Sequence, residues 1–258
     1  MGRKKNIMNK ILNNSLCTIS IVSHGDSLAV TKMIRNSSSF YFEDNFEILI
    51  RENRDTHSFA FENLSKEFSN VTIEYNSEVY GFGMNHNLNF SIRSKESKFF
   101  IVCNPDLVQL PEILNLNDYI SDKWHLSTPN IFDIDGSLSD FKRSDINLRT
   151  LVKRYLFNSS SGIARTNDDF LWVPSIFTIF SSELFNTLKG YDTNIFMYYE
   201  DYDICMRASL YTNLKILDSE VLHEGRRASR TNFSLLFAHL KSVFYVMRKR
   251  GKGLYNKD

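Results

Sequence analysis

The first hundred residues alternate short apolar runs with helical patterns. Four of these runs are rich in β-branched and aromatic residues and have the length of buried strands: Leu16–Ser23, Phe46–Glu52, Asn70–Tyr75 and Lys98–Cys103. Strands that alternate with helices usually pair in parallel, because each helix carries the chain back across the sheet. The pattern predicts an α/β fold with a mostly parallel central sheet flanked by helices.

Polar side chains follow three of these strands. "SHGD" begins at Ser23, "RENRD" ends at Asp55, and "NPD" ends at Asp106. The carboxyl ends of parallel strands meet at one edge of a sheet, and ligands of such sheets bind at that edge. The three polar groups therefore predict a ligand site there.

Composition excludes several classes of protein. A length of 258 residues suits one large α/β domain, and a net charge of +1 gives no global basic field for nucleic acid. Cys17, Cys103 and Cys205 lie in separate apolar stretches without metal-type spacing, as in reduced core cysteines of a cytosolic protein. No apolar run approaches the roughly 18 to 20 residues that span a membrane.

The stretch "YYEDYDICMR" places Glu200, Asp201 and Asp203 within four residues, between apolar neighbours. A helix dipole explains one or two of these acids, and Asp203 is spaced to pair with Arg207 on the same helix. These structural roles leave Glu200 and Asp201 without a full explanation. A partly buried carboxylate near other carboxylates binds protons more tightly, which is what a general base requires.

Three further motifs each have a structural and a functional interpretation. Asp106 either closes a polar turn or binds a divalent metal that carries a diphosphate. Gly81 and Gly83 precede a predicted helix, where they form a tight turn or let the backbone approach a ligand closely. His223 in "VLHEG" follows another short strand and is a core histidine unless Asp106 lies nearby in space.

In this order, the segments resemble family 2 glycosyltransferases with the GT-A fold, over about Ser15–Arg250. Within that family, "CNPD", "FMYYEDYDICMR" and "HLKSVFYVMRKR" look most like bacterial O-antigen rhamnosyltransferases. The resemblance implies an inverting enzyme of lipopolysaccharide synthesis. Such an enzyme adds L-rhamnose in α-1,3 linkage, from dTDP-rhamnose, to N-acetylglucosamine on a polyprenyl diphosphate. It also implies a GT-A domain at 15–231, between a basic tail at 1–14 and an amphipathic basic helix at 232–258.

The resemblance also implies roles for particular residues. Asp201 is the catalytic base, beside Glu200, and Asp106 with His223 holds a divalent metal, magnesium or manganese. Trp172 and Tyr199 lie where an acceptor sugar would bind, although a core position for Trp172 is an equal alternative. The residues implied in donor binding are Ser23, His24, Asn53, Asp55, Gly81, Gly83, Asn85, Asn87, Asn104 and Asp106.

The chain departs from the family pattern at three places. Asn104 replaces the first acid of the metal-binding "DxD" signature, and "RENRD" stands where the family usually has "VDN". Pro174 and Ser175 replace a pair of small residues before the acceptor site. Two alternatives follow, namely the same chemistry with a UDP-sugar donor or an inactive scaffold of a polysaccharide assembly complex. A Rossmann dehydrogenase is disfavoured because no GxGxxG follows the first strand.

The segment Phe233–Lys252 combines apolar residues at helical spacing with a basic end. Such a helix can lie on an anionic membrane surface. It can also pack on the domain. Both arrangements are compatible if the apolar face points inward and the basic end points outward. We therefore expect a cytoplasmic protein that is peripheral on the inner face of the bacterial plasma membrane.

Overall fold

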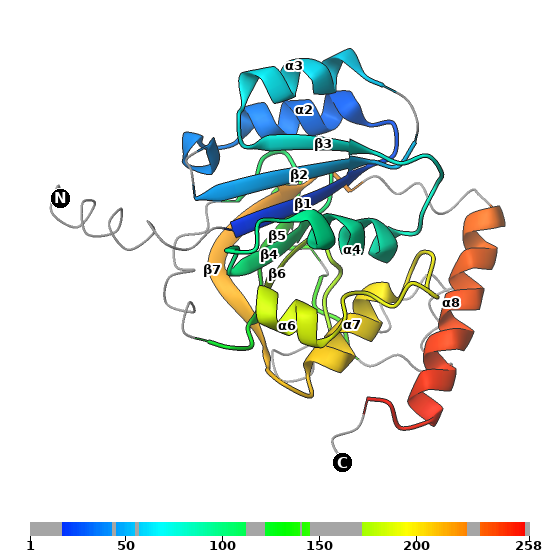
Figure 1. Cartoon of the computed structure of the whole chain (residues 1–258). Coiled ribbons are helices and arrows are strands. Elements are labelled where there is room, and N and C mark those ends of the chain that lie inside the picture. Colours follow the sequence, from blue (N-terminus) through cyan, green and yellow to red (C-terminus); the bar gives the residue numbers. More distant parts are fainter. Residues whose placement is uncertain are drawn as a thin grey trace, which may run out of the picture.

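The computed structural model describes residues 17–42, 45–54, 57–111, 122–139, 141–144, 172–225 and 233–255. These residues contain one sheet of seven strands in the order β3-β2-β1-β4-β6-β5-β7 (Figure 1). The strands are β1 Cys17–Ser23, β2 Phe46–Glu52, β3 Val71–Tyr75, β4 Phe99–Cys103, β5 Leu126–Asp133, β6 Phe177–Ser181 and β7 Leu214–His223. The first four confirm the strands that the sequence predicts.

The sheet is mostly parallel, as expected. Only β6 runs antiparallel to its neighbours, β4 and β5, among the pairings of these strands. Sequence analysis did not predict β5, which contains Pro129 at a register shift against β7. The short strand expected before His223 is the end of the longer β7.

Helices cover both faces of this sheet (Figure 1). They are α2 Ser27–Asn36, α3 Phe59–Glu67, α4 Phe82–Ile92, α6 Ser182–Thr187, α7 Glu200–Ala208 and α8 Phe233–Gly251, with a 3-10 turn, η2, at Ser39–Phe42. Helix α4 packs on β1 and β2, α6 packs on β6 and β4, and α2 lies beside α3. Helix α8 stands at one side of the domain, beyond α7.

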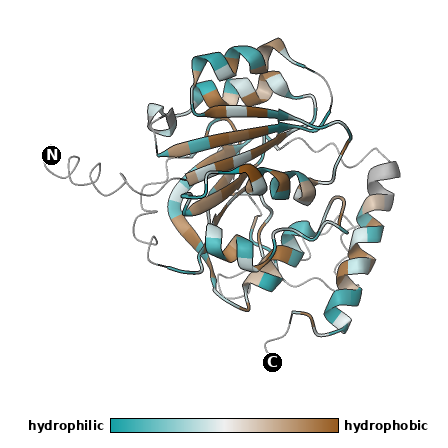
Figure 2. Cartoon of the chain, viewed as in Figure 1, coloured by the Kyte–Doolittle hydropathy of each residue, from teal (hydrophilic) through white to brown (hydrophobic). Residues whose placement is uncertain are grey.

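The core lies between these layers, and the central strands β1, β4 and β6 are mostly hydrophobic in sequence (Figure 2) and buried along their whole length. Such two-sided burial explains why these strands read as continuous apolar runs. The three cysteines are buried in this core, as predicted. Among the described residues, no helix has the length and apolar character to cross a membrane.

Candidate active site

The first polar loop at the carboxyl edge folds around a buried acid, Glu52. Its Oε2 accepts a 2.7 Å hydrogen bond from the Ser23 hydroxyl, and its Oε1 accepts one of 2.9 Å from the Gly25 amide. The Ser23 hydroxyl in turn accepts from the Asp26 amide at 3.1 Å. Glu52 thereby shapes the loop that carries Ser23. Sequence reasoning did not name Glu52, although an acid at the end of a buried strand is a usable signal.

Asn53 joins this loop to the segment after β3. Its Nδ2 donates to the Tyr80 carbonyl at 2.7 Å and lies 3.1 Å from His24 Nδ1. Its Oδ1 accepts from the Tyr80 amide at 2.9 Å and from Asn76 Nδ2 at 2.8 Å, and Asn76 also reaches Asn85 Oδ1 at 2.6 Å. Burial lowers the pKa of His24, so its imidazole is neutral at pH 7. Asn53 and Asn85 thus organise the predicted donor edge through contacts within the protein.

Gly81, Gly83 and Asn87 hold α4 against the segment that precedes α7. A Cβ on Gly81 would lie 2.4 Å from the Phe196 carbonyl oxygen, and one on Gly83 would lie 2.5 Å from the Cβ of Tyr191. Asn87 exchanges hydrogen bonds of 2.8 and 2.9 Å with the Tyr191 backbone. Close packing accounts for these residues, and their direct contact with a donor stays a prediction. The predicted donor residue at position 55 lies outside the described residues.

Asp106 and His223 meet in the folded chain. Asp106 Oδ2 lies 3.1 Å from His223 Nε2, and the two side chains are 17% and 14% exposed. Their backbones are also joined, because the Glu224 amide donates to the Asp106 carbonyl at 2.9 Å and Leu107 forms a bridge with His223. The structure therefore meets the condition on which a functional role of His223 depended.

This pair fits a divalent ion, since a carboxylate oxygen and an imidazole nitrogen are both common metal donors. Among the residues that the structure describes, no group of three His, Cys, Asp or Glu side chains is placed to hold a metal. The described protein groups therefore amount to a two-ligand site. Further coordination would have to come from a bound diphosphate and water.

Two consecutive residues with left-handed backbone precede α7. Tyr198 has φ 69° and Tyr199 has φ 65°. For residues with a Cβ, this conformation costs on the order of 1 kcal/mol or more each and survives only where the surroundings enforce it. The turn sets Glu200 and Asp201 in the first turn of α7, where the helix dipole favours negative charge. Strain of this kind directly before two acids is typical of a functional site.

Asp201 is half-buried and lies close to Ser175. Burial raises the pKa of Asp201 to about 6, against the lowering effect of hydrogen bonds from the Ser175 hydroxyl and amide. The Ser175 hydroxyl also lies 2.8 Å from the Tyr191 hydroxyl. Burial and the charge of Asp201 raise the pKa of Glu200 well above its ordinary value. At neutral pH, Asp201 is thus a carboxylate that accepts protons readily, beside a second acid whose pKa is also raised.

Asp203 has a structural role, although it lies two residues from Asp201. Its fully buried carboxylate accepts from Arg207 Nε at 2.8 Å, from the Tyr255 hydroxyl at 2.7 Å, and from Lys249 Nζ. Lys249 also donates to Asp192 Oδ2 at 3.0 Å. The pairing with Arg207 that the sequence predicts is confirmed, and Asp203 also anchors α8 to α7.

Adjacent strand ends connect the pair of Asp106 and His223 to the acidic turn. The Asn104 amide, two residues before Asp106, donates to the Ile176 carbonyl at 2.9 Å. Ile176 directly follows Ser175, which lies close to Asp201. Sequence reasoning noted Ser175 only as a departure from the family pattern. Its contact with Asp201 depends on the fold and carries no local sequence signal.

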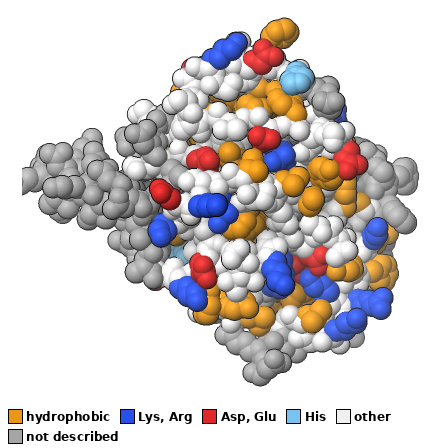
Figure 3. All heavy atoms as spheres, viewed as in Figure 1, with side chains coloured by type: hydrophobic (Ala, Val, Ile, Leu, Met, Phe, Trp, Pro, Cys, Tyr) orange, Lys and Arg blue, Asp and Glu red, His pale blue; other side chains and the backbone are white. Residues whose placement is uncertain are grey.

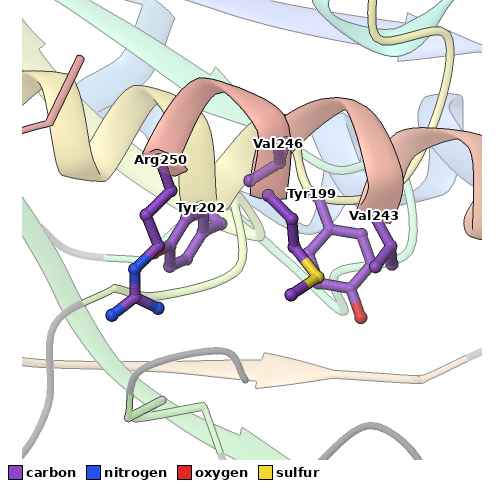
Figure 4. A pocket seen from close by; sticks show the side chains of 6 residues that line it. Tyr199, Tyr202, Val243, Val246 and Arg250 are labelled. Atoms are coloured by element: carbon purple, nitrogen blue, oxygen red, sulfur yellow. The ribbon is translucent and has the colours of Figure 1, made fainter. Parts of the chain in front are cut away.

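The two predicted acceptor residues lie near α8. Trp172 donates through Nε1 to the Ser144 carbonyl at 2.9 Å and packs edge-on against Tyr202, which favours its core interpretation. Tyr199 lines a small hollow between α7 and α8 (Figure 4). The other residues around this hollow are Tyr202, Val243, Val246, Met247 and Arg250. Acceptor binding by Trp172 and Tyr199 stays a prediction.

Solved structures with this fold are glycosyltransferases. A mannosyltransferase from Pyrobaculum calidifontis, in complex with GDP-Man and Mn²⁺, matches 90% of this chain and 64% of its own length, with a TM-score of 0.60 and 12% identity. GalNAc-T7 with UDP, GalNAc and Mn²⁺ matches 84% of this chain and 44% of its own length, with a TM-score of 0.57 and 15% identity. S. aureus TarS 1–349 in complex with UDP-GlcNAc matches 84% of this chain and 62% of its own length, with a TM-score of 0.53 and 14% identity. The chain thus spans less than two thirds of each of these structures.

The chain has the GT-A fold of these glycosyltransferases, as the sequence predicts. No protein family model matches the chain. The rhamnosyltransferase WbbL of Escherichia coli strain K12 is 28% identical over 253 residues, which cover 90% of this chain and 93% of WbbL. The likeness to a rhamnosyltransferase therefore extends over nearly the whole chain.

Proposed function

We propose that the protein is an inverting transferase that moves L-rhamnose from dTDP-rhamnose onto a saccharide linked to polyprenyl diphosphate. The observation that carries the proposal is Asp201, a carboxylate with a pKa raised to about 6, close to Ser175 and beside the strand ends that carry Asp106 and His223. Similarity to WbbL supports rhamnose as the transferred sugar. Structures of the same fold with bound GDP-Man and UDP-GlcNAc support a nucleotide-sugar donor.

Asp201 accepts the proton of the acceptor hydroxyl as that oxygen attacks the anomeric carbon. The bond between this carbon and the donor diphosphate breaks, and its electron pair leaves with the nucleoside diphosphate. Attack from the opposite face inverts the anomeric configuration. The Ser175 hydroxyl and amide orient the carboxylate for this transfer. General-base help of this kind is typically worth about 10²–10⁴-fold in rate.

Asp106 and His223 would hold a magnesium or manganese ion at the donor diphosphate. An ion bound there would neutralise the charge that develops on the departing diphosphate. With Asn104 in place of an acid, Asp106 is the one carboxylate of the "NPD" motif. The protein by itself should therefore bind metal weakly, and a bound donor should strengthen that binding.

The outward face of α8 supports attachment to a membrane surface. Leu240 and Phe244, one turn apart, are 46% and 68% exposed, whereas Val243 and Val246 point into the protein. Basic side chains accompany the exposed pair: Lys241, Arg248 and Lys252. Figure 3 shows apolar and basic side chains together over α8. This combination suits the anionic inner face of a plasma membrane, where a polyprenyl-linked acceptor would reside.

A panel of nucleotide sugars tests the donor. Purified protein is supplied with dTDP-rhamnose, UDP-galactofuranose, UDP-N-acetylglucosamine or GDP-mannose, together with a lipid-diphosphate N-acetylglucosamine acceptor. We expect nucleoside diphosphate release and a disaccharide product with dTDP-rhamnose. Preferred turnover of a UDP-sugar would show that dTDP-rhamnose is not the donor, while the proposed inverting transfer would stand. No turnover with any donor would favour the inactive scaffold.

A further inference from the structure

We propose that His239 and Ser242 of α8 are positioning residues for the proposed base. They hold Met197, Tyr198 and Tyr199 in the conformation that presents Asp201 to the acceptor. This inference rests on the proposed function of Asp201. It assigns to the C-terminal helix a part in catalysis that is distinct from membrane attachment.

His239 contacts both residues that have left-handed backbone. The centroid of its ring lies 4.9 Å from that of Tyr198 and 4.9 Å from that of Tyr199. Ser242, one turn further along α8, donates from its hydroxyl to the Met197 carbonyl at 2.8 Å and is buried. One short stretch of α8 thus contacts each of the three residues that lead into Glu200.

The opposite side of the turn is held by α4. The Phe82 amide donates to the Phe196 carbonyl at 3.0 Å, and the close approach of Gly81 to the same carbonyl leaves no room for a side chain. The turn is therefore clamped between α4 and α8. Strained backbone persists only where surrounding contacts over-determine it, and this clamp supplies such contacts.

Lys249 fixes α8 relative to this turn. It binds Asp192, which precedes the turn, and Asp203, which follows it. Helix α8 therefore contacts the segment 192–203, which carries Asp201, at both ends and in the middle. Val243 and Val246 add buried apolar contact along the same inward face.

Catalysis by Asp201 requires hydrogen-bond reach of the acceptor hydroxyl, and a displacement of about 1 Å can cost up to about a hundredfold in rate. The loops around Glu52 and Asn53, which form part of the predicted donor edge, come from the ends of β1, β2 and β3 and not from this turn. Loosening the turn should therefore lower kcat and leave donor affinity nearly unchanged.

The test uses full-length His239→Ala and Ser242→Ala variants. We expect kcat to fall about tenfold in each, with donor KM within about twofold of wild type. His239→Phe, which keeps a ring between the two tyrosines, should recover most of the lost kcat. The matched control is Tyr245→Phe, which removes the hydrogen bond from α8 to Asp192 and leaves Lys249 bound there. This control should lower the melting temperature by a similar amount and leave kcat within about twofold.

Hydrogen–deuterium exchange without substrate gives a readout that does not depend on the proposed function. Amides of residues 196–201 should exchange about tenfold faster in Ser242→Ala, while those of β1 stay at the wild-type rate. Unchanged exchange in both alanine variants would overturn the positioning role, whether or not the wild type turns over any donor. Unchanged kcat despite faster exchange, or an equal loss of kcat in Tyr245→Phe, would overturn its catalytic importance.

Discussion

Replacing Asp201 with asparagine should make the protein more stable at neutral pH and far less active. The pKa of Asp201 is about 6 in the folded chain, against an ordinary value of 3.8. A difference of about two units corresponds to about 3 kcal/mol at roughly 1.4 kcal/mol per unit. Because Asp201 is only half-buried, solvent screening reduces this to about 1–3 kcal/mol. For a chain of this size, that amounts to several degrees in melting temperature.

The pH dependence follows from the direction of the shift. A carboxyl whose folded pKa is raised destabilises the folded state only where it is ionised. Near pH 3.8 and below, the group is protonated in the folded state, and the penalty is largely absent. The penalty grows as pH rises and is complete above pH 6. The asparagine variant should therefore gain most over wild type at pH 7.5 and progressively less toward pH 4.5.

Thermal unfolding from pH 4.5 to 8 tests the predicted gain in stability of Asp201→Asn, and initial rates at saturating donor test the predicted loss of activity. Turnover should fall at least about a hundredfold, the lower end of general-base contributions. The contrasting variant is Asp203→Asn, which weakens buried pairs with Arg207 and Lys249 and should cost about 3–5 kcal/mol. An Asp201→Asn protein that is less stable than wild type at pH 7.5, or whose gain does not vary with pH, would refute the electrostatic reasoning. Near wild-type turnover would remove Asp201 from the mechanism.

Three further predictions concern the base, the metal and the membrane. Ser175→Ala removes a hydrogen bond that lowers the pKa of Asp201, so the acid limb of kcat/KM should move to higher pH, and an unmoved limb would contradict the contact. His223→Ala should weaken manganese-supported activity more than magnesium-supported activity, because imidazole suits manganese better. Identical metal titrations would exclude His223 as a ligand, and turnover unaffected by EDTA would exclude the metal. Serine at both Leu240 and Phe244 should reduce flotation with anionic liposomes while kcat on a soluble acceptor stays constant, whereas wild type that shows no salt-sensitive binding would argue against attachment.

Local pattern was sufficient to predict the first half of the sheet. β1, β2 and β4 are buried strands, β3 is a shorter run of the same kind at the sheet edge, and each is bounded by polar turns, so each strand is encoded within its own residues. β5 was missed because Pro129 interrupts it, and its pairing with β6 and β7 comes from distant parts of the chain. The antiparallel direction of β6 likewise depends on the path of the chain between elements.

Residue patterns are enough to single out the candidate chemical groups, namely the acids around Asp201 and the "NPD" carboxylate of Asp106. The surroundings of each group depend on the fold. Asp201 and Asp203 are near neighbours, yet about 100° of rotation per residue on a helix directs them to different surroundings. Ser175 lies close to the first, and Lys249 of α8 pairs with the second. His223 reaches Asp106 only because the segment after β4 crosses to the end of β7, and long-range contacts of this kind carry no signal in local residue patterns.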